Sequence, residues 1–247
     1  MNLYLSQVDQ EINEDHSIHY ANILKTGLCT VIPNTGSFNK EFGILFRPVN
    51  LLTENTSMLF KNQHYTYQFL NSIVSANADL KLFNTDFTIV KYDEVKQNVV
   101  PNNIFVKPNN KIKAFQPVEL YKGEKILNLG LEDTDDLELV VTSVKDISKI
   151  KEVRCIVFEN QLLSLIDTDN EKTQFHSNVY KYALKCIKTI QAVDSTLTGY
   201  VLDLAVSQQD TCSIMELNPL ETSGFFLSDY SRTLKTISTL LKQKSVE

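Results

Sequence analysis

The 247-residue sequence predicts an α+β protein made of two parts. In the first hundred residues, short strand patterns alternate with helical patterns, as in α/β structures. Beyond residue 100, strand patterns come in pairs separated by turn-forming residues, which is typical of antiparallel hairpins. We therefore place a domain boundary near residue 100, with a small α/β domain at residues 1–99 and a larger domain at residues 100–247.

The smaller N-terminal part combines four short apolar runs with two helical patterns. In residues 16–28, Ile18, Ala21 and Ile23 follow a helical spacing, and Gly27 is typical of a helix end. The same spacing predicts a second helix at residues 65–78. The apolar runs, which are typical of strands, are LYLSQV (3–8), CTVIP (29–33), FGILFRPV (42–49) and FTIVKY (87–92).

The larger part begins with two hairpin patterns. In NIFVKPNNKIKAFQPVEL (103–120), the PNN tripeptide supplies the turn between two strands. In EVRCIVFENQLLSLID (152–167), an EN dipeptide stands at the predicted tip. The remaining patterns are a strand at 137–144 after an acidic run, a helix at 173–193, strands at 200–206 and 213–218, and a helix at 228–242.

Composition and charge narrow the class of protein. The net charge of −6 and the pI near 5.3 argue against a general binder of nucleic acid or anionic membranes, which needs a basic surface. The four cysteines form no CxxC pair and fit reduced thiols rather than a disulfide framework or a zinc site. No signal peptide is visible, and no apolar stretch approaches the ~20 residues that a membrane span needs. We expect a cytoplasmic protein with no membrane or nucleic-acid partner.

Three polar side chains stand out on the last two strand patterns. We centre the loop of their hairpin on Gln209 and Asp210. Asp203 then lies opposite Glu216, and Asn218 shares the face of Glu216 because strand side chains alternate. Two facing carboxylates repel, and Mg²⁺ relieves such repulsion because it prefers oxygen ligands. An exposed strand face that is polar by default explains the same spacing, so both interpretations stay open.

Basic residues form two further candidate groups. Lys107 ends an apolar strand and Lys113 follows the turn, so a hairpin brings two ammonium groups within reach of one strongly negative group such as a triphosphate. Solvated hairpin lysines are the alternative. On the next hairpin, Glu152 and Arg154 share one face, and the arginine fork matches phosphate or carboxylate. A surface ion pair is the alternative there.

The order of these groups along the chain resembles the ATP-grasp superfamily. It most resembles the short viral and bacterial clade that has two lysines close together on the first hairpin. The segments that carry the resemblance are FVKPNNKIKAF (105–115), EVRCIV (152–157), YVLDLAV (200–206) and MELNP (215–219). The resemblance covers roughly residues 100–230 and implies two α+β lobes that close on a nucleotide, preceded by a smaller α/β domain.

The resemblance implies roles for the basic residues and for one strand. Lys107 and Lys113 would hold the phosphates of ATP, and Arg154 would lie at the γ-phosphate, so that Arg154 and Lys113 act in catalysis. The strand at 139–144 would be the hinge that contacts adenine, through Val141 and Ser143. Asp203, Glu216 and Asn218 would hold one or two Mg²⁺ ions.

The implied function is an ATP- and Mg²⁺-dependent ligase. Such an enzyme activates a carboxylate as an acyl phosphate, which an amine or similar nucleophile then attacks, and its partners are small-molecule or peptide carboxylates and amines. An alternative is a catalytically degenerate nucleotide-binding module that acts as a regulator or adaptor. The chain has only seven glycines, and the candidate phosphate loop PNNKI has none, which favours the alternative slightly because glycine lets backbone amides approach phosphates. A structural or host-interaction protein with coincidental motifs is a third hypothesis, and the oligomeric state is not readable.

Overall fold

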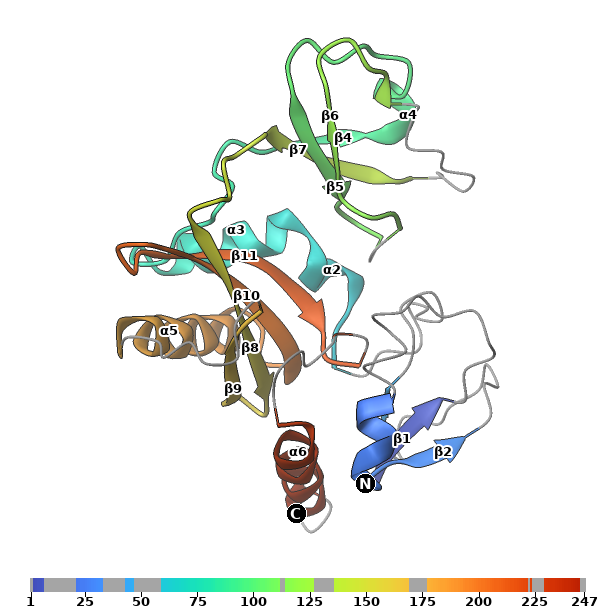
Figure 1. Cartoon of the computed structure of the whole chain (residues 1–247), viewed down its shortest axis with the longest axis vertical. Helices are drawn as coiled ribbons and strands as arrows, with labels where there is room; N and C mark the ends of the chain where they lie inside the picture. Colours follow the sequence, from blue (N-terminus) through green and yellow to red (C-terminus); the bar gives the residue numbers. More distant parts are fainter. Residues whose placement is uncertain are drawn as a thin grey trace.

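The computed structural model describes residues 2–6, 21–32, 43–46, 59–111, 114–126, 136–168, 177–221, 223 and 229–244. In this part of the chain, three sheets and their covering helices make up the fold (Figure 1). The predicted α+β class is confirmed, because a parallel three-stranded sheet accompanies two antiparallel four-stranded sheets. None of the helices described is long and apolar enough to cross a membrane.

The parallel sheet comes from the N-terminal segment that the sequence predicted to be α/β. Residues 21–26 are helical, and the earlier part of the predicted helix, residues 16–20, lies outside the described residues. Ile23 of this helix is fully buried against Leu3 and Ile44 of the sheet. The strands, in the order β2-β1-β3, are β1 (Asn2–Ser6), β2 (Thr30–Ile32) and β3 (Gly43–Phe46).

The second sheet contains the first predicted hairpin. Ile104 pairs with Leu120, and the second strand begins only at Val118, later than the PNN turn suggested. The side chain of Asn109 is buried in hydrogen bonds to another element, so the chain leaves the sheet before it returns. The strands, in the order β4-β7-β5-β6, are β4 (Thr88–Lys91), β5 (Ile104–Pro108), β6 (Val118–Leu120) and β7 (Glu138–Ser143), with the short helix α4 (Tyr92–Val95) after β4.

The predicted domain division remains a prediction. Strand β4 lies before residue 100 in the sequence, yet it pairs with β7, which lies after it. The second sheet therefore draws on both sides of that position.

The third sheet contains the last two predicted hairpins. Glu159 and Asn160 form the tip of the first, both with positive φ (49° and 58°), as a tight two-residue hairpin turn requires. In the second, Asp203 pairs with Glu216, as predicted, and a register shift follows between Asp203 and Leu204. The strands, in the order β11-β10-β8-β9, are β8 (Ile150–Phe158), β9 (Gln161–Asp167), β10 (Gly199–Ser207) and β11 (Cys212–Pro219).

Helices cover both faces of this third sheet. Helix α5 buries Val179, Ala183, Ile187 and Ile190, which share one side because they lie three or four residues apart. Helix α3 packs beside α5 on the same face, and α6 contributes to the core on the opposite face together with β1. The helices are α2 (Asn62–Tyr65), α3 (Tyr67–Ala76), α5 (Ser177–Val193) and α6 (Tyr230–Lys244).

Strand alternation separates apolar from polar side chains in the third sheet. Cys155 and Leu202 belong to the core beneath α3 and α5. Arg154 and Asp203, one position away on the same strands, therefore point to the opposite face. On that face the apolar core with α6 occupies one end of the strands, and the polar residues occupy the other.

Candidate functional site

Five of the residues predicted for the site converge. Asp203 lies on the inner strand β10, so it pairs with Arg154 of β8 on one side and with Glu216 of β11 on the other. Asn218 lies two residues beyond Glu216 on β11 and therefore shares its face. Lys107, at the end of β5, reaches this face from the second sheet, and its Nζ lies 3.2 Å from the Oε2 atom of Glu216.

Arg154 and Asp203 form a buried, two-pronged ion pair. The Nε and Nη2 atoms of Arg154 donate to the two carboxylate oxygens of Asp203, each at 2.8 Å. Asp203 is fully buried and Arg154 is 8% exposed. Burial lowers the pKa of Arg154, but the charge and hydrogen bonds of Asp203 raise it by more, so the net shift is upward. The pair is therefore ionised, with planar geometry that suits an arginine.

The amide of Asn218 links the two carboxylates. Its Nδ2 atom donates to Asp203 Oδ2 at 2.9 Å and to Glu216 Oε1 at 2.7 Å. Its Oδ1 atom is buried and has no hydrogen-bond partner among the described residues. A buried amide oxygen without a partner is costly for a folded protein, which makes it a candidate ligand atom.

Lys107 is held between one carboxylate and two aromatic rings. Its side chain is 5% exposed, and its Nζ lies 4.8 Å from the ring centre of Tyr67 and 5.7 Å from that of Tyr65. Burial lowers the pKa of Lys107, but the charge of Glu216 and the two tyrosines raise it by more. Lys107 is therefore a charged ammonium at neutral pH, fixed at one side of a pocket.

The predicted metal ligands are two carboxylates and an amide. No group of three or more His, Cys, Asp or Glu side chains is placed to hold a metal ion in the described part of the chain. The protein's own cations, Arg154 and Lys107, offset the repulsion between Asp203 and Glu216 that suggested a metal. The oxygen-only donor set, with the buried Oδ1 atom of Asn218 in it, nevertheless fits Mg²⁺.

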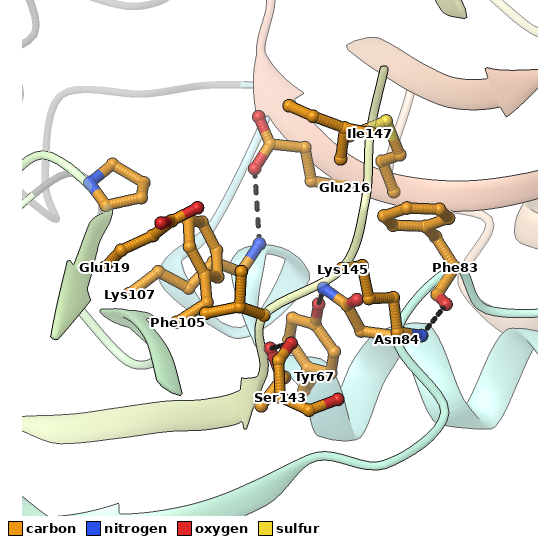
Figure 2. Close-up of a pocket in the computed structure, with 14 residues that line it drawn as sticks. Tyr67, Phe83, Asn84, Phe105, Lys107, Glu119, Ser143, Lys145, Ile147 and Glu216 are labelled. Carbon is orange, nitrogen blue, oxygen red and sulfur yellow. Dashed lines mark hydrogen bonds and ion pairs between the residues drawn. The ribbon is translucent and has the colours of Figure 1, made fainter. Parts of the chain in front are cut away.

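A pocket opens beside Lys107 and Glu216, between the second and third sheets. Figure 2 shows these two side chains pointing toward each other at its wall. Ser143 lines the pocket, and its Oγ donates to Asp86, which lowers the pKa of that carboxyl. Val141 does not line this pocket; its side chain packs against the core of the second sheet.

Several wall residues were missed by reasoning from the sequence. The apolar part of the wall includes Phe83, Phe105 and Ile147, and Ile147 is 64% exposed. Lys145 also lines the pocket; its Nζ donates to the carbonyl oxygen of Phe83 at 2.6 Å and lies 3.4 Å from Asp86. Most of these residues stand in connecting segments, where no periodic pattern marks them. The one available signal was the apolar start of β5, which contains Phe105.

Lys113, the second predicted phosphate-binding lysine, lies outside the described residues. The neighbouring Lys111 is described and half-buried. The predicted pair of hairpin lysines therefore contributes one placed member, Lys107, to the site.

Two antiparallel sheets with a pocket between them, lined by a lysine and the acid-amide set of a hairpin, are the arrangement expected of an ATP-grasp protein. The model of one ATP-grasp domain family, the second family of its clade, matches residues 84–235. The chain belongs to this family. The match contains four of the converging residues on the third sheet and also Lys107.

Solved structures share the fold at low sequence identity. D-alanine–D-alanine ligase from Bacillus anthracis aligns with a TM-score of 0.60 and 12% identity, over 100% of this chain and 99% of that one. D-cycloserine synthetase DcsG gives a TM-score of 0.61 and 10% identity, over 98% and 100%. The RimK domain ATP-grasp protein from Sphaerobacter thermophilus gives 0.58 and 9%, over 97% and 99%. No curated protein matches the chain.

Proposed function

We propose that the protein is an ATP- and Mg²⁺-dependent ligase that activates a carboxylate for attack by an amine or similar nucleophile. The observation that carries the proposal is the convergence of Lys107, Arg154, Asp203, Glu216 and Asn218 at one wall of a pocket between two sheets. Membership of the ATP-grasp family supports it, and so does the likeness to structures named as ligases.

The pocket suits a nucleotide. Its apolar wall at Phe83, Phe105 and Ile147 offers surface for a base, next to the backbone of 142–145. Lys107 stands at the side where Glu216 lies, so phosphates would point toward the third sheet. We assign Ser143 to the base end of the pocket, and we keep the assignments of Val141 to adenine and of Lys113 to the phosphates as proposals.

The acid-amide set would hold the metal. Asp203, Glu216 and Asn218 would bind one or two Mg²⁺ ions, which neutralise phosphate charge when bound. Lys107 and Arg154 would bind and orient the phosphates beside the set, Arg154 at the γ-phosphate. Phosphoryl transfer requires positioning and charge neutralisation more than covalent help from the protein, which this set of residues can provide.

The proposed reaction has two steps. A carboxylate oxygen of the substrate forms a bond to the γ-phosphorus as the bond to ADP breaks, which gives an acyl phosphate. The amine then attacks the acyl carbon, and inorganic phosphate leaves as the amine loses a proton. We propose small-molecule or peptide substrates and a cytoplasmic location, and residues 1–99 as a leading domain that borders the acceptor side.

Thermal unfolding with and without ATP and Mg²⁺ is the first test. A ligand that binds only the folded state at ~100 times its dissociation constant raises the free energy of unfolding by about 2.7 kcal/mol. We expect wild type to show a Mg²⁺-dependent rise in melting temperature that Glu216→Gln loses. Glu94→Gln, an exposed change on α4, is the matched control and should keep the rise.

Trapping the activated carboxylate tests the chemistry itself. Hydroxylamine converts an acyl phosphate to a hydroxamate, so ADP and hydroxamate should form together from the right member of a panel of carboxylic acids. Nucleotide binding with no such product from a broad panel would count against the ligase.

A nucleotide-binding regulator or adaptor is the second candidate. One observation favours it: both carboxylates of the proposed metal set are already paired with Lys107 and Arg154, in a chain with only seven glycines. This candidate predicts a thermal shift with ATP or ADP and no ADP formation with any carboxylate.

A further inference from the structure

We propose that Tyr67 is a positioning residue whose ring face holds the Lys107 ammonium at the pocket wall, with Tyr65 as a second, more distant ring. The role we assign is to keep Lys107 in place when nucleotide and metal compete for its partner Glu216. This inference rests on the proposed function, because it concerns how the same pocket receives a nucleotide.

The contact itself is close and buried. The Nζ atom of Lys107 lies 4.8 Å from the ring centre of Tyr67, within the range where an aromatic face attracts a cation. Tyr67 is 1% exposed, Tyr65 is 4% exposed and Lys107 is 5% exposed, so water hardly screens the attraction. Tyr67 also lines the pocket, which places the ring next to any ligand bound there.

The ring of Tyr67 is fixed from two sides. Its hydroxyl accepts a hydrogen bond of 3.2 Å from Asn84 Nδ2. The ring of Phe87 packs against it, with centres 4.9 Å apart and planes tilted by 56°. A ring held at its edge and at its hydroxyl keeps one orientation, so the face it offers to Lys107 is set before any ligand arrives.

Helix α3 and strand β5 are joined directly at this point. The backbone N–H of Tyr67 donates to Asn109 Oδ1 at 2.9 Å, and Asn109 lies two residues beyond Lys107. Asn109 is fully buried, and its Nδ2 atom donates to Gln68 and to Glu138. The first residue of α3 and the end of β5 therefore hold a fixed relative position, which fixes the distance from ring to ammonium.

The need for such a clamp follows from the single charged partner of Lys107 that the structure places among the described residues. Glu216 accepts from Lys107 through Oε2 and is also a proposed metal ligand. A carboxylate that turns to a metal weakens its bond to the ammonium, and a buried ammonium without support is costly. The tyrosine rings cannot be drawn away in that manner. They would hold Lys107 where the incoming phosphate becomes its new partner.

This contact is a feature of the chain and not of its family match. Tyr67 and Tyr65 precede residue 84, where the matched region begins, whereas Lys107 lies inside it. The segment before the matched region therefore contributes directly to the site.

Binding of ADP with Mg²⁺ to the full chain, measured by calorimetry, tests the clamp. We expect Tyr67→Leu to weaken binding about 3- to 30-fold, the range for a desolvated cation–ring contact. Tyr67→Phe keeps the ring face and should keep most of the affinity. Tyr92→Leu, a buried tyrosine in the core of the second sheet, controls for general loss of packing and should bind as wild type does.

A double-mutant comparison separates the clamp from a purely structural role. In a Lys107→Met background there is no ammonium to hold, so Tyr67→Leu should change affinity far less than it does in wild type. Equal weakening in both backgrounds, or a Tyr67→Phe variant as weak as Tyr67→Leu, would overturn the proposal.

A readout without nucleotide makes the outcome independent of the proposed function. In urea unfolding of the ligand-free chain, changes at Tyr67 and Lys107 should be non-additive, because the two side chains touch. Additive effects would reject the clamp even if ADP binds. Non-additive effects in a wild-type protein that binds neither ADP nor ATP would reject the nucleotide function and the positioning role, and leave only a structural contact.

Discussion

Replacing Arg154 by methionine is the sharpest test of how the site is held together. Asp203 is fully buried and receives two 2.8 Å hydrogen bonds from Arg154, so the change leaves a carboxylate with Asn218 as its remaining donor at the site. Removing one partner of a buried ion pair costs about 3–5 kcal/mol. Whole domains have stabilities of about 5–15 kcal/mol, so we expect a large loss.

Urea unfolding followed by far-ultraviolet circular dichroism measures this loss, since the chain has no tryptophan to report by fluorescence. The double variant Arg154→Met with Asp203→Leu removes both charges and should recover much of the stability, because apolar replacement of a whole buried pair is close to neutral. Lys96→Met breaks the exposed pair with Asp93 and should have a far smaller effect.

Two results would refute this reasoning. If Arg154→Met cost less than about 1 kcal/mol, the pair would behave as a solvated surface pair. If the double variant were as unstable as the sum of its single changes, Arg154 and Asp203 would not depend on each other.

Three further changes test other parts of the structure. Asn218→Asp should lower the melting temperature without metal, because three carboxylates then meet, and should increase the stabilisation by Mg²⁺; equal Mg²⁺ effects in both proteins would contradict the metal assignment. Burial lowers the pKa of His64 below 6.5 despite the raising effect of its bond to Asp194, so stability should be full above about pH 6.5 and fall as the pH drops below it. Urea midpoints across that range should show the fall in wild type and not in His64→Gln. Gly199→Ala places a Cβ atom 2.6 Å from Leu59 and should cost about 1–3 kcal/mol in the same assay, whereas a neutral result would mean that the Leu59 side chain moves aside.

The register of the last hairpin was predictable from the sequence. A loop centred on residues 209 and 210 places Asp203 opposite Glu216, and the structure has this pairing. The prediction succeeded because a hairpin is local and its turn residues limit the alignment. The same locality explains the tip at Glu159 and Asn160.

Partners from distant segments were not predictable. The sequence placed Arg154 beside Glu152, but its main partner is Asp203, which follows only after another strand and the helix α5. Strand β8 pairs with β10 across that interval, and no local pattern encodes which strand becomes the neighbour. The contact of Lys107 with Glu216 is harder still, because it joins two different sheets.

The distant contacts also determine how ligands bind. In the ligand-free protein Lys107 and Glu216 neutralise each other, so metal alone must compete with the ammonium for the carboxylate. Lys107→Met removes that competitor, and we expect Mg²⁺ alone to raise the melting temperature of this variant more than that of wild type. ATP with Mg²⁺ should do the opposite and stabilise the variant less, since a phosphate partner is lost. Lys96→Met, at an exposed site, should respond as wild type to both additions. An unchanged response of Lys107→Met to Mg²⁺ alone would mean that Glu216 does not serve as a metal ligand.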